Sequence, residues 1–343
     1  MVLYLRIFFA LMYAAALVAY PGYALAGARD GLRLWAVSVA PAILPFAAVV
    51  PYLTCAEVRR IYDRLLGGAM RRLFRLPGSA ASAMVTGMIA GSPAGALAAA
   101  RVAASEGMTR GEALRLAGMC CGVSPVYALS VMGIGLNGSA AMGWRLVISQ
   151  AAAQLITGLL FRGAFYNMNE GVEAGAGNAY ESPVSGAVNA VLRAGGYMAV
   201  FSAGLSMAYG AAGGAVKYIS PLMDLPSGSV WLAGIKAPGW TSAMALGFGG
   251  ACIASQNLAV LKCTGINSLL FLGMKLICGM VCGAVYAVIG KACGAETVSA
   301  VVKSGGVFDM SMLVMAFFIL PAVLFSAGNT LKNIFLNNRK LGE

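Results

Sequence analysis

Residues 79–100 read SAASAMVTGMIAGSPAGALAAA, and their composition and central interruption indicate the class of fold. Its side chains are apolar and small, which is typical of helices that pack closely inside a membrane. The sequence Gly91-Ser92-Pro93-Ala94-Gly95 interrupts it, because proline removes a backbone donor and clashes with the preceding helical turn. A broken helix is stable at membrane depth only where protein or a water-filled cavity surrounds the freed backbone groups. The stretch therefore predicts an all-α, polytopic membrane helix bundle with broken or re-entrant helices.

The composition of the whole chain also indicates a membrane protein. Of its 343 residues, 60% are hydrophobic and 10% are charged, and the mean hydropathy is +0.81. A soluble domain carries about 25% charged residues, so this chain has too few to cover a water-facing surface. Its apolar sequence is long enough for eight to ten membrane segments of roughly 20 residues each.

The chain carries a net charge of +12 at pH 7. In a soluble protein this excess would suggest nucleic-acid binding, but in a membrane protein it is typical of cytoplasmic loops that face anionic lipid. We expect no nucleic-acid partner. The basic residues are densest in Arg59–Arg75, where they alternate with apolar residues in a predicted amphipathic helix over Glu57–Leu76. This helix is expected to lie at the cytoplasmic interface and to bind anionic lipid.

The sequence lacks the groups on which most enzymes depend. It has no His, and its eight Cys stand mostly inside apolar segments without the paired spacing of a zinc site. No nucleophile–base pair and no cluster of metal ligands is visible in the sequence. We predict that the protein is not an enzyme and that it holds no metal or other cofactor.

A polar, glycine-rich linker divides the chain into two parts. The predicted parts are an N-terminal transmembrane helix in residues 1–30, a first repeat in 31–165, the linker in 166–186, a second repeat in 187–292, and a C-terminal transmembrane helix with a basic tail in 293–343. Three prolines predict a kinked or broken span over Leu34–Leu53. By the positive-inside rule, the basic helix places its own loop and the N-terminus on the cytoplasmic side. An inverted second half would place the C-terminal tail on the other side, although the tail is basic and should also be cytoplasmic. These two topological arguments conflict.

The two halves resemble each other in sequence. Pro77-Gly78 and the following Ser82-Ala83-Met84 recur as Pro238-Gly239 and Ser242-Ala243-Met244, and from Ser82 onward the offset is 160 residues. The same offset aligns Gly91–Gly95 with Ala251–Ser255. Glycine- and proline-interrupted apolar segments at matching positions are the best sequence indication of a transporter's binding site at the middle of the membrane. The repeat therefore predicts two breaks that face each other.

The candidate substrate-binding residues lie at and beside these interruptions. The first break could form a substrate loop, or it could be a kink that allows close packing. The polar residues after the second break could bind substrate, or they could form hydrogen bonds between helices. We interpret Gln150 and Gln154 as interhelical hydrogen-bonding residues and leave them out of the site. The predicted site residues are Gly91, Ser92, Pro93, Gly95, Ser124, Pro125, Ser255, Gln256 and Asn257.

Two basic residues occupy equivalent positions in the repeat. Arg115 and Lys275 could neutralise the carboxylate of an anionic solute, or they could extend from helix ends to the membrane interface. Half-helix N-termini also suit an anion, because their N–H groups are unsatisfied. Asp224 and Asp309 stand at segment edges, so the sequence places no acidic residue within a span, which argues against an acidic proton relay. Coupling to sodium or another ion stays open.

Several motifs together resemble one family. The runs Met70–Pro77 (MRRLFRLP), Met88–Ala96 (MIAGSPAGA), Thr109–Leu116 (TRGEALRL) and Ser124–Tyr127 (SPVY) resemble the YlbJ/SpoVV sporulation integral membrane proteins, over roughly Leu34 to Ile289. These are relatives of the nucleoside-recognition Gate domain and of concentrative nucleoside transporters. The resemblance implies two Gate-like repeats. The chain departs from the family at Met119–Pro125, which lacks the expected asparagines, and at Trp231–Ala237, which lacks a Glu-Thr-Asn stretch.

The resemblance implies transport of dipicolinate, a planar aromatic dicarboxylate, during sporulation. It places the protein in the bacterial cell membrane and, more narrowly, in the forespore outer membrane. We therefore expect a transporter of a small anionic solute that works by alternating access. A nucleoside or nucleobase permease and a non-transporting membrane scaffold are the alternatives, and a homo-oligomer is compatible with each of them.

Overall fold

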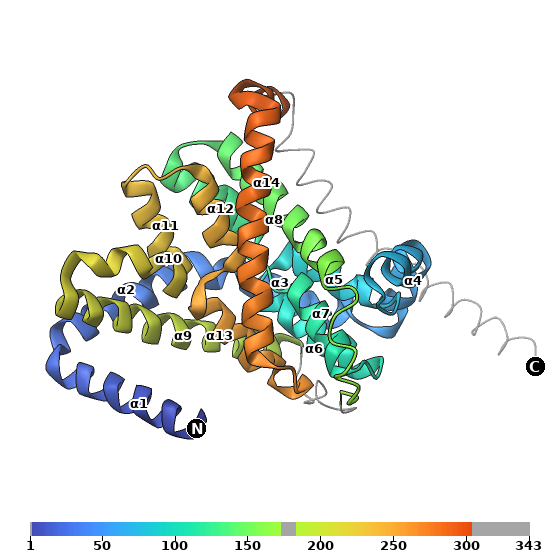
Figure 1. Ribbon diagram of the computed structural model, residues 1–343, viewed down its shortest axis with the longest axis horizontal. Coiled ribbons are helices and arrows are strands. Elements are labelled where there is room, and N and C mark those ends of the chain that lie inside the picture. Colours follow the sequence, from blue (N-terminus) through green and yellow to red (C-terminus); the bar gives the residue numbers. More distant parts are fainter. Residues whose placement is uncertain (1, 173–182, 304–343) are drawn as a thin grey trace, which may run out of the picture. The chain divides into compact units, whose positions relative to one another are not determined.

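The computed structural model describes residues 2–172 and 183–303 (Figure 1). These residues form helices and no β-strand, which confirms the predicted all-α membrane bundle. The helices up to Gly294 belong to one compact unit. The helical elements are α1 Val2–Ala19, α2 Pro21–Leu34, η1 Trp35–Val39, α3 Ala40–Leu53, α4 Ala56–Ala69, η2 Met70–Phe74, α5 Ala80–Ala90, α6 Ala94–Ser105, α7 Arg110–Cys120, η3 Tyr127–Leu136, α8 Ala140–Leu160, α9 Pro183–Ala212, η4 Gly213–Ile219, α10 Ser220–Met223, α11 Leu225–Gly234, α12 Gly239–Phe248, α13 Gly250–Leu261, η5 Lys262–Thr264 and α14 Ser268–Lys303.

Three helical stretches are long and apolar enough to cross a membrane: Ser185–Met223, Gly239–Thr264 and Ser268–Ala292. A fourth is present if Ile7–Ala19 and Pro21–Val37, which meet at 106°, form one bent span. These are fewer than the eight to ten segments expected, because backbone breaks divide other apolar stretches of the described chain into helices of 10–17 residues. Residues 304–343, which hold most of the predicted C-terminal transmembrane helix and its basic tail, lie outside the described residues.

The stretch Leu34–Leu53, predicted to be kinked or broken, keeps helical hydrogen bonding but is interrupted by a π-helix, and Pro21–Val37 and Ile43–Leu53 are separate straight helices. The chain is helical from Pro21 to Leu53, with the π-helix η1 followed directly by α3, and Pro45 and Pro51 lie inside α3. The sharp bend occurs earlier, at Tyr20, where the backbone leaves the helical region (φ −128°, ψ 53°) just before Pro21. Proline at the start of a helix needs no donor, so the helix begins there and continues.

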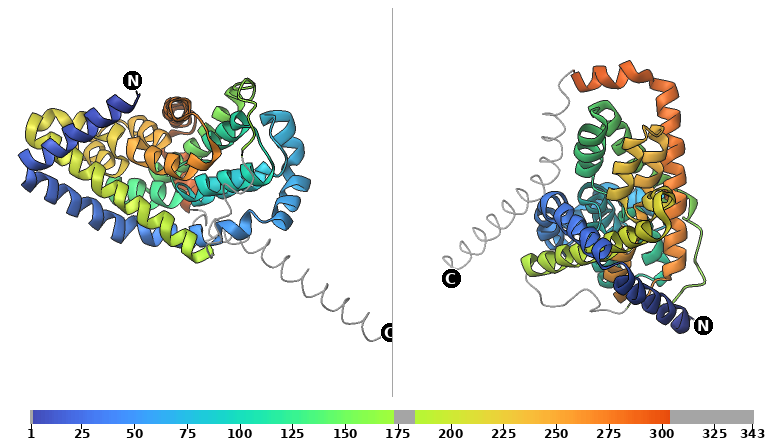
Figure 2. Two further views of the ribbon diagram at one scale, coloured as in Figure 1. Left: turned by 90° about the horizontal axis from the view of Figure 1, so that it is seen from below. Right: turned by 90° about the vertical axis from the view of Figure 1, so that its left-hand side faces the viewer.

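The helices α2 and α9 lie side by side (Figures 1 and 2). Gly27 and Gly31 face α9, where a Cβ on Gly31 would lie 2.8 Å from the carbonyl oxygen of Met198 and 2.9 Å from Cβ of Ser202. Glycine thus lets the two backbones approach closely, as is common between helices in membranes.

The first predicted break forms a re-entrant hairpin. Helices α5 and α6 pack against each other on either side of Gly91-Ser92-Pro93, and both outer ends of the pair meet the basic helix α4. At the α6 end, Arg59 pairs with Glu106 at 2.6 Å. At the α5 end, Gly78 lies against Asp63, which itself pairs with an arginine of η2. The chain therefore enters and returns on one side of the molecule.

The second predicted break has a different geometry. It lies at Gly249 and Gly250, whose φ values of 84° and 78° suit glycine, and Ala251–Asn257 is helical within α13. The alignment of Gly91–Gly95 with Ala251–Ser255 therefore misplaced the second break by about two residues. Helices α12 and α13 do not fold back on each other but together form the stretch Gly239–Thr264. A further break separates α7 from the helix that contains η3.

The basic segment is helical over α4 and η2, and Arg75 ends it in the left-handed conformation (φ 53°). This agrees with the amphipathic helix expected over Glu57–Leu76. Arg59 and Arg71 form ion pairs within the protein. Arg60, Arg64 and Arg72 are exposed on its surface.

Candidate functional site

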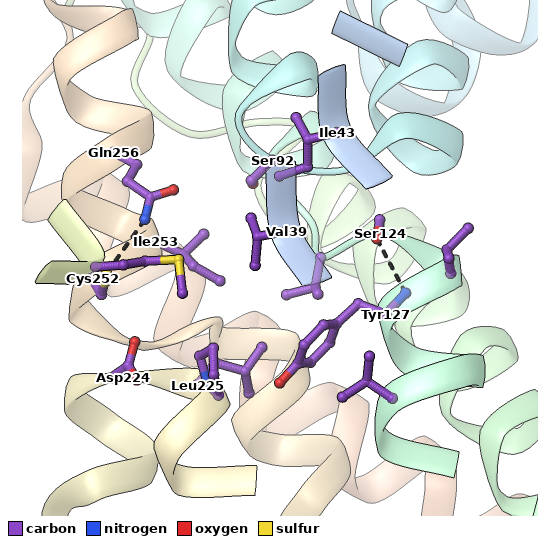
Figure 3. A pocket seen from close by; sticks show the side chains of 15 residues that line it. Val39, Ile43, Ser92, Ser124, Tyr127, Asp224, Leu225, Cys252, Ile253 and Gln256 are labelled. Atoms are coloured by element: carbon purple, nitrogen blue, oxygen red, sulfur yellow. Dashed lines mark hydrogen bonds between the residues drawn. The ribbon is translucent and has the colours of Figure 1, made fainter. Parts of the chain in front are cut away.

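The three breaks converge on one cavity (Figure 3). Its volume is about 70 Å³, which is room for several water molecules at about 10–15 Å³ each. Apolar side chains form most of its wall. The polar lining residues are Ser92, Ser124, Tyr127, Asp224, Cys252 and Gln256. The apolar ones are Val39, Ile43, Val123, Val126, Val131, Met198, Leu225, Pro226 and Ile253.

The hairpin tip is joined to the break after α7 by a backbone hydrogen bond. The N–H of Ser92 donates to the carbonyl oxygen of Gly122 at 2.7 Å. Gly91 adopts φ 71°, and a Cβ at this position would collide with the backbone of Ser124. A Cβ on Gly95 would collide with the carbonyl oxygen of Cys120. Glycine at both positions lets the hairpin tip approach this break closely.

The hairpin tip is joined to α13 by side chains. The Asn257 amide Nδ2 donates to Oγ of Ser92 at 3.0 Å, and Asn257 is 0% exposed. Its Oδ1 has no hydrogen-bond partner among the described residues. The neighbouring residue Gln256 donates from Nε2 to Sγ of Cys252, one turn earlier in α13, at 3.3 Å. Both side chains line the cavity.

The two glutamines of α8 bind backbone carbonyls at the break after α7. Nε2 of Gln150 donates to the Val123 carbonyl oxygen at 2.5 Å, and Nε2 of Gln154 donates to that of Met119 at 2.8 Å. A break leaves helix carbonyls without their usual donors, and in lipid such groups are costly. The glutamines therefore stabilise the break, in keeping with their interpretation as interhelical hydrogen-bonding residues.

The predicted site residues fall into three groups. Ser92, Ser124 and Gln256 line the cavity. Gly91, Pro93, Gly95 and Asn257 are buried and set the position of the hairpin tip and of α13. Pro125 and Ser255 are half-buried and do not line the cavity.

Arg115 and Lys275 lie outside the cavity lining. Arg115 is 3% exposed, and its guanidinium donates to the carbonyl oxygens of Phe74 at 3.3 Å and Arg162 at 2.7 Å. Lys275, which is 2% exposed, lies near the thiols of Cys121 and Cys282. Arg115 thus satisfies the carbonyls at two element ends, which gives it a packing role.

Three polar residues of the cavity lining were not among the predicted site residues: Tyr127, Asp224 and Cys252. Asp224 is the acidic one. It lies in the turn after the candidate span Ser185–Met223, caps the N-terminus of α11, and is 3% exposed. Its Oδ2 accepts from the N–H of Ser227 at 3.1 Å and from its hydroxyl at 2.6 Å, while Oδ1 has no partner among the described residues. Burial raises the pKa of Asp224, and the hydrogen bonds from Ser227 partly oppose this rise. The sequence did contain a signal for this helix start, because Asp224 is a preferred N-cap residue and Pro226 occupies the second position of the helix.

Helix N-termini surround the cavity. Ser92 precedes α6, Leu225 opens α11, Cys252 lies in the first turn of α13, and Ser124 precedes the helix that contains η3. Each helix N-terminus carries a partial positive charge. Within residues 2–172 and 183–303, no lysine or arginine lines this cavity. Among the described residues, no group of three or more His, Cys, Asp or Glu could hold a metal ion.

Comparison with known proteins gives one curated relative. The chain is similar to the sporulation integral membrane protein YlbJ of Bacillus subtilis (strain 168), with 26% identity over 154 residues. The match spans 45% of this chain and 38% of the relative. No protein-family model and no solved structure matches the chain. The similarity confirms the resemblance to YlbJ that the motifs indicated, and with the long apolar helices it supports a multi-pass membrane protein.

Proposed function

We propose that the protein transports a small solute across the membrane by alternating exposure of the cavity between the hairpin α5–α6 and the broken stretch α12–α13. The observation that carries this proposal is the hydrogen bond between Asn257 and Ser92. It joins the tip of the first break to α13, the helix that follows the second break, beside the cavity. Breaks of this kind are found where helices line a solute pathway.

A duplication of the two halves would explain the paired breaks. With the offset of 160 residues, α5–α6 corresponds to α12–α13, and α7 corresponds to the first part of α14. Arg115 and Lys275, which occupy equivalent positions, are both buried. The halves differ in that the first pair folds back on itself. Two Gate-like repeats that have diverged in this way are part of the proposal.

A small carboxylate is the favoured substrate class. The partial positive charges of several helix N-termini suit an anion, and the apolar wall suits a planar ring. The resemblance to the sporulation proteins adds dipicolinate as the specific candidate and the forespore outer membrane as the specific location. Arg115 contributes to this site through packing rather than through contact with the solute.

A nucleoside or nucleobase is the second candidate. The Tyr127 ring, the Ser92 hydroxyl and the Gln256 amide offer stacking and hydrogen bonds to an uncharged base. The absence of a lysine or arginine from the cavity lining favours this candidate.

Purified protein in proteoliposomes tests these alternatives. Influx of radiolabelled dipicolinate is expected to exceed that of uridine, and Gln256→Ala is expected to lower it. Uridine influx without dipicolinate influx would select the nucleoside permease. Influx of neither solute would remove the transport proposal and leave the scaffold, for which Ser92→Ala, Gln256→Ala and Asn257→Ala should all preserve the sporulation phenotype.

A further inference from the structure

Asp224 lines the cavity, and its Oδ1 has no hydrogen-bond partner among the described residues (Figure 3). None of the ion pairs formed by the described residues involves Asp224. The groups that face it are the phenol of Tyr127 from η3, the thiol of Cys252 from α13, and Ser227 from its own helix. Each of these groups is uncharged at neutral pH.

We propose that Asp224 carries one proton with each solute anion, so that the cavity binds the anion only when Asp224 is protonated. This inference rests on the proposed transport function. It concerns a residue in the turn between two candidate spans, which the sequence had placed at a segment edge.

Hydrogen-bonding geometry distinguishes the two oxygens. Oδ2 already accepts two hydrogen bonds from Ser227. A proton is therefore expected on Oδ1, which among the described groups accepts no hydrogen bond within normal geometry and has only the weak thiol donor of Cys252 near the carboxyl. There it converts an unpaired acceptor of a cavity-lining residue into a donor. An anionic carboxylate of the solute can accept that hydrogen bond, and such charge-assisted bonds are roughly twice as strong as neutral ones.

Ionised Asp224 would have the opposite effect. Two carboxylates that share a water-poor cavity repel each other, and one of them must take up a proton for both to stay. The Asp224 carboxylate takes up the proton from water before the solute binds, and it returns the proton to water after the solute leaves. The net movement is one proton and one solute anion in the same direction.

A second cavity supplies a route for the proton. It has a volume of about 440 Å³ and is lined by Ser227, whose hydroxyl binds Oδ2 of Asp224. Its titratable lining groups are Asp30 from α2, Tyr209 from α9 and Lys217 from η4, and the Lys217 ammonium lies 5.2 Å from the centre of the Tyr209 ring. Water in this cavity can exchange a proton with Oδ2 of Asp224 through the Ser227 hydroxyl. Rotation of the carboxyl group then brings the protonated oxygen to the unpaired position.

The first experiment measures the dipicolinate dissociation constant of the full-length protein in nanodiscs as a function of pH. Above the pKa of Asp224, wild-type affinity should fall by about tenfold for each unit of rising pH, because each unit removes a factor of ten in the protonated fraction. Asp224→Asn, which keeps a neutral side chain of the same shape, should bind with little dependence on pH. Asp63→Asn, which changes an exposed acid on α4, should keep the wild-type profile.

The second experiment requires no solute. Infrared difference spectra recorded across a pH titration should show the carbonyl band of a protonated carboxyl in wild type, and Asp224→Asn should remove that band. An ionised Asp224, or an Asp224→Asn variant that keeps the wild-type pH profile, would overturn the inference while leaving transport possible. Absence of dipicolinate influx in wild type at every pH would instead overturn the transport of this anion, and proton coupling to it as well.

Discussion

Asn257 holds the hairpin tip against α13 with one hydrogen bond. Its Nδ2 donates to Ser92, its Oδ1 has no partner among the described side chains and backbone groups, and the residue is fully buried. A buried amide in this state is costly unless a ligand or a second conformation uses its free acceptor. The residue is therefore suited to a contact that forms and breaks during a transport cycle.

Asn257→Ala is predicted to lower dipicolinate influx by about tenfold, because the hairpin tip loses its connection to α13 and Ser92 loses a donor. The free energy of unfolding should fall by about 1 kcal/mol, the typical net value of one hydrogen bond. Influx into proteoliposomes and thermal unfolding in detergent measure the two effects. Ser255→Ala, on the same helix but away from the cavity, should leave influx unchanged.

Arg115→Met is predicted to destabilise the protein without weakening solute binding. The substitution removes the guanidinium donor from both carbonyls, and the Arg162 carbonyl keeps only the Tyr166 hydroxyl at 3.4 Å. A buried unsatisfied group costs about 1–3 kcal/mol. Thermal unfolding measures the loss, and calorimetry measures the dipicolinate dissociation constant. A stable variant with weakened binding would restore Arg115 to the role of neutralising the anion.

At the scale of elements, the breaks allow backbones to meet closely. Gly87 and Gly95 lie on the two arms of the hairpin, and a Cβ on either would collide with the carbonyl of Cys120. The end of α7 thus lies against the hairpin arms, where the carbonyls freed by the break are bound by the glutamines of α8. A change in this contact would move the cavity wall.

Gly95→Ala is therefore predicted to lower the free energy of unfolding by about 1–3 kcal/mol, as expected for overpacking a close contact. Gly68→Ala, on exposed α4 with nothing within 4 Å of the added carbon, is the matched control. It should be neutral or slightly stabilising because alanine has the higher helix propensity. Thermal unfolding of both variants in detergent makes the comparison.

The exposed arginines of α4 and η2 predict a lipid effect. We propose that Arg60, Arg64 and Arg72 bind phosphates of anionic lipid, because they are exposed on a basic helix. In nanodiscs, anionic lipid should raise the melting temperature of wild type more than that of Arg60→Gln/Arg64→Gln/Arg72→Gln. An equal rise in both proteins would contradict lipid binding by these residues.

At the scale of the whole molecule, alternating access requires the cavity to open to water in turn on each side. Cys252 lines the cavity, whereas Cys120, Cys278 and Cys282 are buried elsewhere. Cys252 is therefore a built-in reporter of that opening.

In a variant with Cys55→Ser and Cys263→Ser, a maleimide is predicted to label Cys252 slowly, and saturating dipicolinate should slow labelling by about tenfold or more, as expected for an occluded thiol. Mass spectrometry of tryptic peptides follows the modification. The same variant with Cys252→Ala should show no solute-dependent labelling. If the labelling rate of Cys252 is the same with and without dipicolinate, the solute does not bind in this cavity.

The sequence by itself determined the helical membrane class, the break at Gly91–Pro93 and the polar residues beside it. These follow from local rules, because proline and glycine act on the backbone within a few residues and hydropathy acts along one segment. Only the tertiary structure decided that the first break returns as a hairpin, that Arg115 binds carbonyls, and that Asp224 faces the cavity. Burial and hydrogen-bond partners depend on residues far apart in the chain, which local patterns do not specify.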